Sequence, residues 1–173
     1  MSNLHERPGV YSVYDASSVL SGGRALRTVG VAAKAAKGDV GKAVTVTGYA
    51  AGAAVFGEDE TPGMSTILRL LFAGGASVVT AVRVAGEGTA EDYRSAFAAL
   101  GKEDAQVLVC DSGEEDVQQA LRGAVEEASA LRHERVAVVG CDGAEVSELV
   151  SRAAALNSER MVLVGPDALD SAG

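Results

Sequence analysis

The sequence predicts an α/β fold, with a mostly parallel β-sheet, helices on both faces and an extended N-terminal arm before it. Short apolar segments recur along the chain, and from residue 61 onward longer segments with apolar residues at helical spacing separate them. Most of the short segments are apolar throughout, as in strands that are buried on both faces of a sheet. This alternation of strands and helices predicts parallel strands joined by helical crossovers.

The predicted strands are short apolar segments bounded by turn-forming residues. They are expected at residues 28–35, 43–47, 77–84, 105–110, 135–141 and 160–165. The segment AVTVT at 43–47 is assigned from its β-branched residues, which favour strands. Strand order stays open at this point, although the right-handed crossover rule leaves few topologies.

The predicted helices are recognised by their ends as well as by their spacing. Thr61 and Pro62 place a hydroxyl cap before a proline in the first turn, and Thr89 with Asp92 forms a capping signature. Asp111 or Ser112 is expected to cap the long helix that follows. The helices are expected at residues 49–57, 61–74, 89–101, 112–131 and 146–156.

Length and composition indicate one ordinary domain with an aliphatic core. The 173 residues are 47% hydrophobic but only 4% aromatic, and the chain contains no Trp. We expect an arm and connector at residues 1–23, an α/β domain at 24–167, and a tail or the start of a further half at 168–173.

Charge argues against nucleic acid and membrane surfaces as partners. The formal net charge is −9, and Lys and Arg are scattered without a polybasic run. No window approaches the ~18 uninterrupted apolar residues of a membrane span, and the N-terminus lacks the layout of a signal peptide. Cys110 and Cys141 are predicted to be buried thiols in a reducing compartment and not a disulfide pair.

The N-terminal arm contains a short strand without an obvious partner. Pro8-Gly9 is followed by four strand-forming residues, Val10, Tyr11, Val13 and Tyr14. No tight turn follows; a Ser- and Gly-rich connector ending in Gly22-Gly23 comes instead and is predicted to be a flexible hinge. Either this strand pairs with another sheet or the segment is an unpaired terminus.

Three aspartates follow predicted parallel strands. Asp111, Asp142 and Asp167 each lie just beyond a strand's carboxyl end, where open α/β sheets build ligand sites. Together they could bind a divalent cation or a magnesium-bound phosphate. The alternative, that each is a helix N-cap, is favoured because no strand end also supplies a base, a nucleophile or a glycine loop.

Other catalytic patterns are weaker. The chain has no G-x-x-x-x-G-K-[ST] phosphate loop and no G-x-S-x-G elbow, and Gly86-Glu87-Gly88 lacks the third glycine of a dinucleotide loop. His5 and His133 have no Cys or second His at metal-ligand spacing. We therefore expect neither an enzyme nor a cofactor.

Several stretches together resemble the sheath protein of contractile tails, which is found in myophages, prophages and R-type bacteriocins. The resemblance covers roughly residues 5 to 165 and matches that family's amino-terminal part. Its pieces are RPGVY at 7–11, TVGVA at 28–32, TVTGY at 45–49, VFG at 55–57, LLFAGGA at 70–76 and VVTAVRV at 78–84.

The resemblance implies a structural role. In such sheaths, arms add strands to the sheets of neighbouring subunits, and the linked subunits form stacked hexameric rings around a tail tube. Contraction then drives the tube through a cell envelope. By this resemblance the partners are other copies of the chain and a tube protein, and the chain belongs to a virion tail or prophage tail-like particle assembled in the host cytoplasm.

One departure from the family concerns length. Sheath proteins are usually much longer and carry a further domain and a second arm, which leaves the complete ring-to-ring mesh in question for this polypeptide. The rival interpretation is a small-ligand or phosphate-binding domain that uses the three aspartates.

Overall fold

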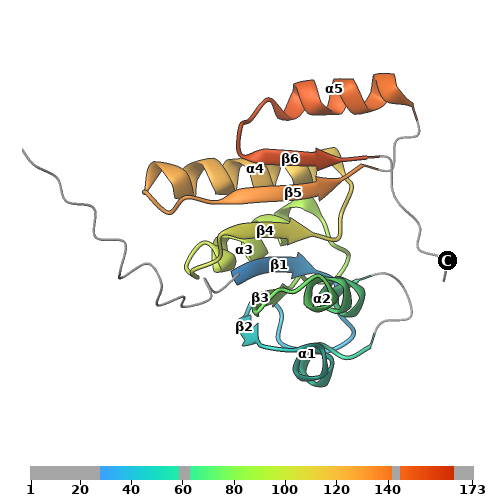
Figure 1. The fold of residues 1–173 in the computed structure, drawn as a ribbon, viewed down its shortest axis with the longest axis vertical. Coiled ribbons are helices and arrows are strands. Elements are labelled where there is room, and N and C mark those ends of the chain that lie inside the picture. The colour runs from blue at the N-terminus through green and yellow to red at the C-terminus, as the bar shows by residue number, and fades with distance from the viewer. Residues whose placement is uncertain (1–27, 59–62, 142–144, 166–173) are drawn as a thin grey trace, which may run out of the picture.

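The computed structural model describes residues 28–58, 63–141 and 145–165 (Figure 1). The predicted arm at 1–23 and tail at 168–173 lie outside them. The strands are β1 (Thr28–Ala33), β2 (Ala43–Val46), β3 (Val78–Arg83), β4 (Val107–Cys110), β5 (Val136–Gly140) and β6 (Met161–Val164). The helices are α1 (Tyr49–Phe56), α2 (Met64–Ala73), α3 (Ala90–Leu100), α4 (Glu115–Ala130) and α5 (Val146–Leu156).

The strands form one six-stranded sheet in the order β2-β3-β1-β4-β5-β6. All neighbouring pairs are parallel except β2 with β3, which is antiparallel. The predicted α/β class with a mostly parallel sheet is therefore confirmed. β1 lies inside the sheet between β3 and β4, and its last five residues are buried.

The direction of the crossovers changes at β1 and divides the helices between the two faces. The chain runs from β1 outward to β3 through α1 and α2, and then back across β1 to β4 through α3. From β4 it continues in that same direction through α4 and α5. Because parallel crossovers are right-handed, the first connection and the later ones lie on opposite faces.

Two aliphatic cores follow from this division. Alternate strand residues such as Val31 and Val79 pack with Phe56, Met64 and Leu68 of α1 and α2. On the other face, the core joins α3 and α4 to the sheet and includes only Leu156 of α5. Its buried members include Val82, Phe97, Leu108, Leu121, Val139 and Leu156. The helices thus cover both faces, as predicted.

One predicted helix cap is confirmed and one is wrong, while Thr61 and Pro62 lie outside the described residues. Thr89 and Asp92 form a reciprocal capping box at the start of α3. The N-cap of α2 is Gly63, which makes no side-chain capping bond, and Met64 N–H donates to the carbonyl of Lys34 at 2.9 Å. The N-cap of α4 is Glu114, whose side chain makes no capping bond.

The residues expected to cap α4 make other contacts. Ser112 Oγ accepts from the backbone N–H of Glu114 at 3.2 Å, one position before the helix begins. Asp111 is bound to groups on other elements, as described below. A strand-end aspartate followed by a helix is therefore insufficient to identify an N-cap.

Arg135 is a buried cation without an acidic partner among its contacts. Its side chain is 4% exposed and donates to the carbonyls of Leu100, Gly101 and Glu103 at 2.8, 3.1 and 2.6 Å. These carbonyls lie at the C-terminal end of α3, where the helix dipole is negative. The guanidinium therefore links α3 to the start of β5.

Replacing Arg135 with Leu should destabilise the fold by about 3 kcal/mol, because buried carbonyls lose their donors. Urea denaturation measures the change. Arg122→Ala is the matched control, since Arg122 pairs with Glu126 on the surface and should cost less than about 1 kcal/mol. Equal losses in the two variants would contradict a special role for Arg135.

Candidate functional site

The carboxyl ends of β1 and β4 meet at the point where the crossover direction changes. In open α/β sheets this is the usual position of a ligand crevice. Here Asp111 lies directly after β4, and its Oδ2 accepts from the backbone N–H of Lys34, directly after β1, at 2.9 Å. The carboxylate thus joins the two loops that would border a crevice.

A second donor reaches Asp111 from α3. The hydroxyl of Tyr93, a residue only 1% exposed, donates to Oδ1 of Asp111 at 2.5 Å. Burial, followed by the hydrogen bond to Asp111, raises the pKa of Tyr93 far above its ordinary value. Both oxygens of Asp111 therefore have partners, and the carboxylate holds three segments of the chain together.

The other predicted ligand residues do not extend this site within the described structure. Asp142 and Asp167 lie outside the described residues, so only one of the three aspartates is placed. In the part of the chain that the structure describes, no group of three or more His, Cys, Asp or Glu could hold a metal ion. The predicted arm residues Pro8, Gly9, Val10, Tyr11, Val13 and Tyr14, and the predicted hinge Gly22-Gly23, also lie outside it.

Both cysteines are free thiols. Cys141 is buried and Cys110 is half-buried, and they form no disulfide. Burial raises the pKa of Cys110 to about 11, so this thiol stays protonated at neutral pH. A thiol in this state is a poor nucleophile.

The far end of the sheet presents a different kind of surface. Val136 and Val138 of β5 and Val162 and Val164 of β6 lie on the face that α1 and α2 cover elsewhere; we call these four residues the valine face. The register pairs Val138 with Val162. Val136, Val162 and Val164 are 38, 45 and 53% exposed. No described helix packs on this part of the sheet.

Helix α5 adds a second apolar surface. Val146 and Val150, four residues apart on its outer side, are 73 and 62% exposed. Leu156 is the one buried residue of this helix. Arg152 ties the helix to the body by donating to the carbonyl of Gly113 at 2.7 Å and to Oε1 of Gln118 at 3.4 Å.

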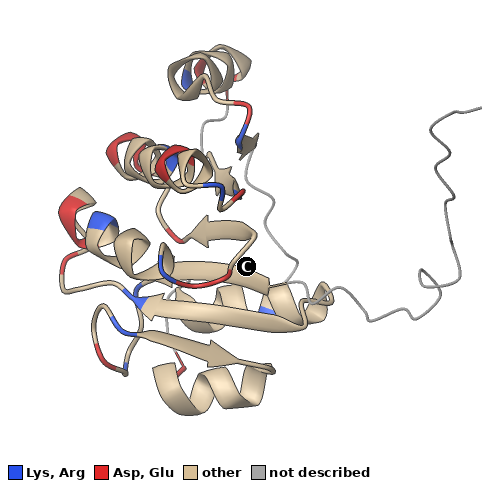
Figure 2. Cartoon of the chain, turned by 90° about the vertical axis from the view of Figure 1, so that its left-hand side faces the viewer, with Lys and Arg blue, Asp and Glu red and all other residues tan. Residues whose placement is uncertain are grey.

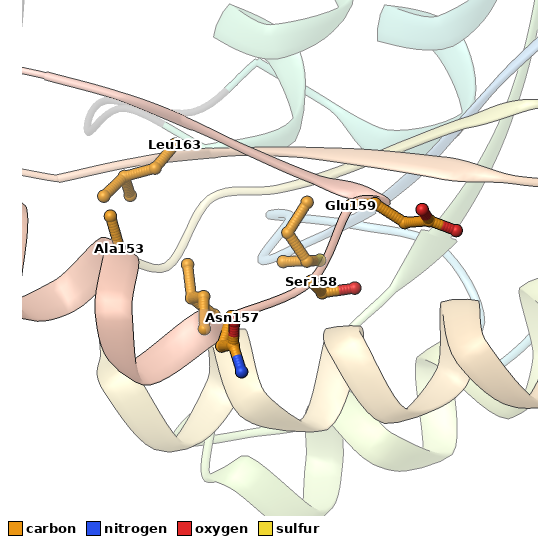
Figure 3. A pocket seen from close by; sticks show the side chains of 7 residues that line it. Ala153, Asn157, Ser158, Glu159 and Leu163 are labelled. Atoms are coloured by element: carbon orange, nitrogen blue, oxygen red, sulfur yellow. The ribbon is translucent and has the colours of Figure 1, made fainter.

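A pocket of about 450 Å³ opens where α5 meets β6 (Figure 3). Its apolar wall consists of Ala153, Leu156, Met161 and Leu163, and the side chains of Asn157, Ser158 and Glu159 complete its lining.

The charges lie elsewhere. Figure 2 colours acidic positions on α3 and α4 red. The acidic residues of these helices include Glu91, Asp92, Glu115, Asp116, Glu126 and Glu127. The strands carry almost no charge in the same view. The valine face is therefore uncharged, whereas α3 and α4 present acidic residues.

Sequence reasoning missed this surface because an apolar strand looks the same whether or not a helix covers it. Residues 160–165 were expected to be buried like the other strands. The sequence of α5 did contain a signal of exposed apolar residues, because Val146 and Val150 lie outside the apolar stripe formed by Leu149 and Leu156.

Among the described residues, no helix has the length and apolar character that crossing a membrane would require.

Comparison with known proteins gives a likeness in structure only. No family model matches the sequence, and no curated protein matches it. A solved structure, the helical sheath of the anti-feeding prophage in its contracted state, matches with a TM-score of 0.58 at 14% identity. The match covers 92% of this chain but 45% of the sheath chain, so this chain spans less than half of that protein. The two share a fold.

Tyr93→Phe should lower the free energy of unfolding by about 2 kcal/mol at neutral pH, because Asp111 loses a buried donor. Above pH 10 the wild type should lose part of this advantage, since the tyrosine ionises in the unfolded chain but stays protonated in the folded one. Denaturation of both proteins at pH 7 and pH 11 measures this. Tyr49→Phe is the control, and an equal effect there would contradict the assignment.

Proposed function

We propose that this chain is a structural subunit of a contractile-tail sheath, which assembles with other copies around a tail tube and contributes to contraction. It acts by self-association and not by catalysis. The observation that carries the proposal is the shared fold with the anti-feeding prophage sheath over 92% of the chain. The resemblance of segments such as residues 7–11 and 70–76 to sheath sequences supports it independently.

Features of the described residues also support a role in assembly. The position where α/β domains usually bind ligands is bridged by Asp111, Tyr93 and Lys34. Among the described residues, five of the eight exposed large hydrophobic side chains lie instead on β5, α5 and β6. Exposed apolar surface of this kind marks a protein interface.

In this proposal the N-terminal arm links subunits. Val10, Tyr11, Val13 and Tyr14 would add a strand to the sheet of a neighbour, and Gly22-Gly23 would let the bodies rotate while the link holds. Strand addition forms main-chain hydrogen bonds, so it can survive a change in the relative orientation of two bodies. The tube protein, the ring arrangement and the location in a tail-like particle belong to the same proposal.

Deleting residues 1–23 should abolish self-association, because the linking strand is lost while the folded body remains. Sedimentation velocity over a range of concentrations, with electron microscopy of the fractions, measures it. The full chain should form large assemblies, and the shortened chain should stay monomeric with an unchanged melting temperature. Assemblies of the same size from both chains would contradict the arm's role, and a monomeric full chain would contradict the proposal as a whole.

A further inference from the structure

Helix α5 and strand β6 bury little apolar surface for their length. They lie together at one end of the molecule (Figures 1 and 2). Between residues 145 and 165, Leu156 is the one residue that is buried. The equally long segment 90–110, which also joins a helix to a strand, buries Tyr93, Ala96, Phe97, Leu100, Ala105 and Leu108. Because buried apolar area is the main stabilising contribution, α5 and β6 are attached to the body less strongly than α3 and β4.

A tight turn joins α5 to β6. Asn157 caps the helix in the left-handed conformation, with φ at 35°, which asparagine tolerates better than most residues. The backbone N–H groups of Met161 and Arg160 donate to Ser158, to its carbonyl at 3.3 Å and to its Oγ at 3.4 Å. Both elements also line the pocket in Figure 3. These contacts lie within residues 146–164, so they survive when the two elements separate from the body together.

Polar groups attach α5 to the body. Arg152 donates to the carbonyl of Gly113, in the loop after β4, at 2.7 Å and to Oε1 of Gln118 on α4 at 3.4 Å. Nε2 of Gln119, also on α4, donates to the carbonyl of Ala155 at 3.0 Å. β6 is the last strand in the sheet order and pairs with β5 in the described structure. The bonds to Gly113 and Ala155 lie at exposed positions, where hydrogen bonds open more readily than in a packed core.

We propose that α5 and β6 open as one unit while β1–β5 stay folded, and that Arg152 is the latch that holds this unit closed. Gln118 is fully buried, and its Nε2 donates to the carbonyl of Gly140 at 2.7 Å, which leaves Oε1 to accept from Arg152. Without Arg152, the closed unit would bury this acceptor without a donor, whereas opening lets water reach it. Arg152 therefore stabilises the closed unit relative to the open one. The latch does not depend on the proposed function.

Opening divides the valine face, because Val136 and Val138 belong to β5 whereas Val162 and Val164 belong to β6. One consequence of this rests on the proposed function. If chains associate through the valine face, an open chain lacks half of the contact surface. The closed fraction then sets how much of the protein is competent to associate.

Hydrogen–deuterium exchange of the full chain at one low protein concentration tests the unit. Residues 146–156 and 161–164 should exchange with the same dependence on dilute urea, and about tenfold or more faster than residues 78–83. Arg152→Ala should accelerate both segments about tenfold, because a buried acceptor loses its donor, and leave residues 78–83 unchanged. Arg94→Ala is the matched control, since it removes an exposed ion pair with Glu91 on α3 and should change neither segment.

Cys141 provides a second readout. Its side chain is 2% exposed, and its backbone N–H donates to the carbonyl of Val164 in β6 at 2.9 Å. Opening of β6 breaks this bond and should admit a thiol reagent. Under native conditions, with modified peptides identified by mass spectrometry, Cys141 should be labelled about tenfold faster in Arg152→Ala than in the wild type. Labelling of Cys141 in Arg94→Ala should match the wild type.

Several outcomes would overturn the inference. If residues 146–156 and 161–164 exchange as slowly as residues 78–83, the unit opens only with the whole fold. If α5 and β6 differ in their urea dependence, they do not open together. Wild-type exchange and labelling in Arg152→Ala, or faster exchange at residues 78–83 in that variant, would exclude a local latch. Each of these results leaves the proposed function standing, since that proposal is tested by the assembly of the full chain.

Discussion

The position of β1 inside the sheet determines the rest of the structure. Once β1 pairs with β3 on one side and β4 on the other, the right-handed crossover rule places α1 and α2 on one face and the later helices on the opposite face. Each later crossover moves farther from β1 without adding a helix to the first face. The valine face is therefore a direct consequence of strand order, and the exposed residues on β5 and β6 need no separate explanation.

The same topology places the usual ligand position of an open α/β sheet at the carboxyl ends of β1 and β4. In this chain, hydrogen bonds to Asp111 connect the segments around that position. Asp111 accepts from Lys34 N–H and from the Tyr93 hydroxyl, so a carboxylate that could have bound a cation joins three chain segments instead. Tyr93 and Cys110 both have pKa values raised by burial, which keeps them neutral. The polar groups of this region stabilise the fold, whereas the open surface lies at the other end of the sheet.

Much of the fold could be predicted from the sequence, because continuous apolar strands and amphipathic helices have distinct periods. The start of α3 was predictable in detail, since Thr89 and Asp92 form reciprocal capping hydrogen bonds only three residues apart. The starts of α2 and α4 were not, because the partners of Met64 and Asp111 come from residues distant in the sequence. The exposure of β6 could not be predicted either, since it depends on which helices lie on each face of the sheet and not on the strand's own residues.

In the proposed self-association, the valine face of β5 and β6 becomes buried, whereas the Asp111 region is already closed in the monomer. Hydrogen–deuterium exchange at low and high protein concentration tests this directly. Exchange at residues 161–164 should slow as the protein concentration rises, while exchange at residues 110–113 should not change. Equal exchange at residues 161–164 under both conditions, in a sample that has associated, would contradict it.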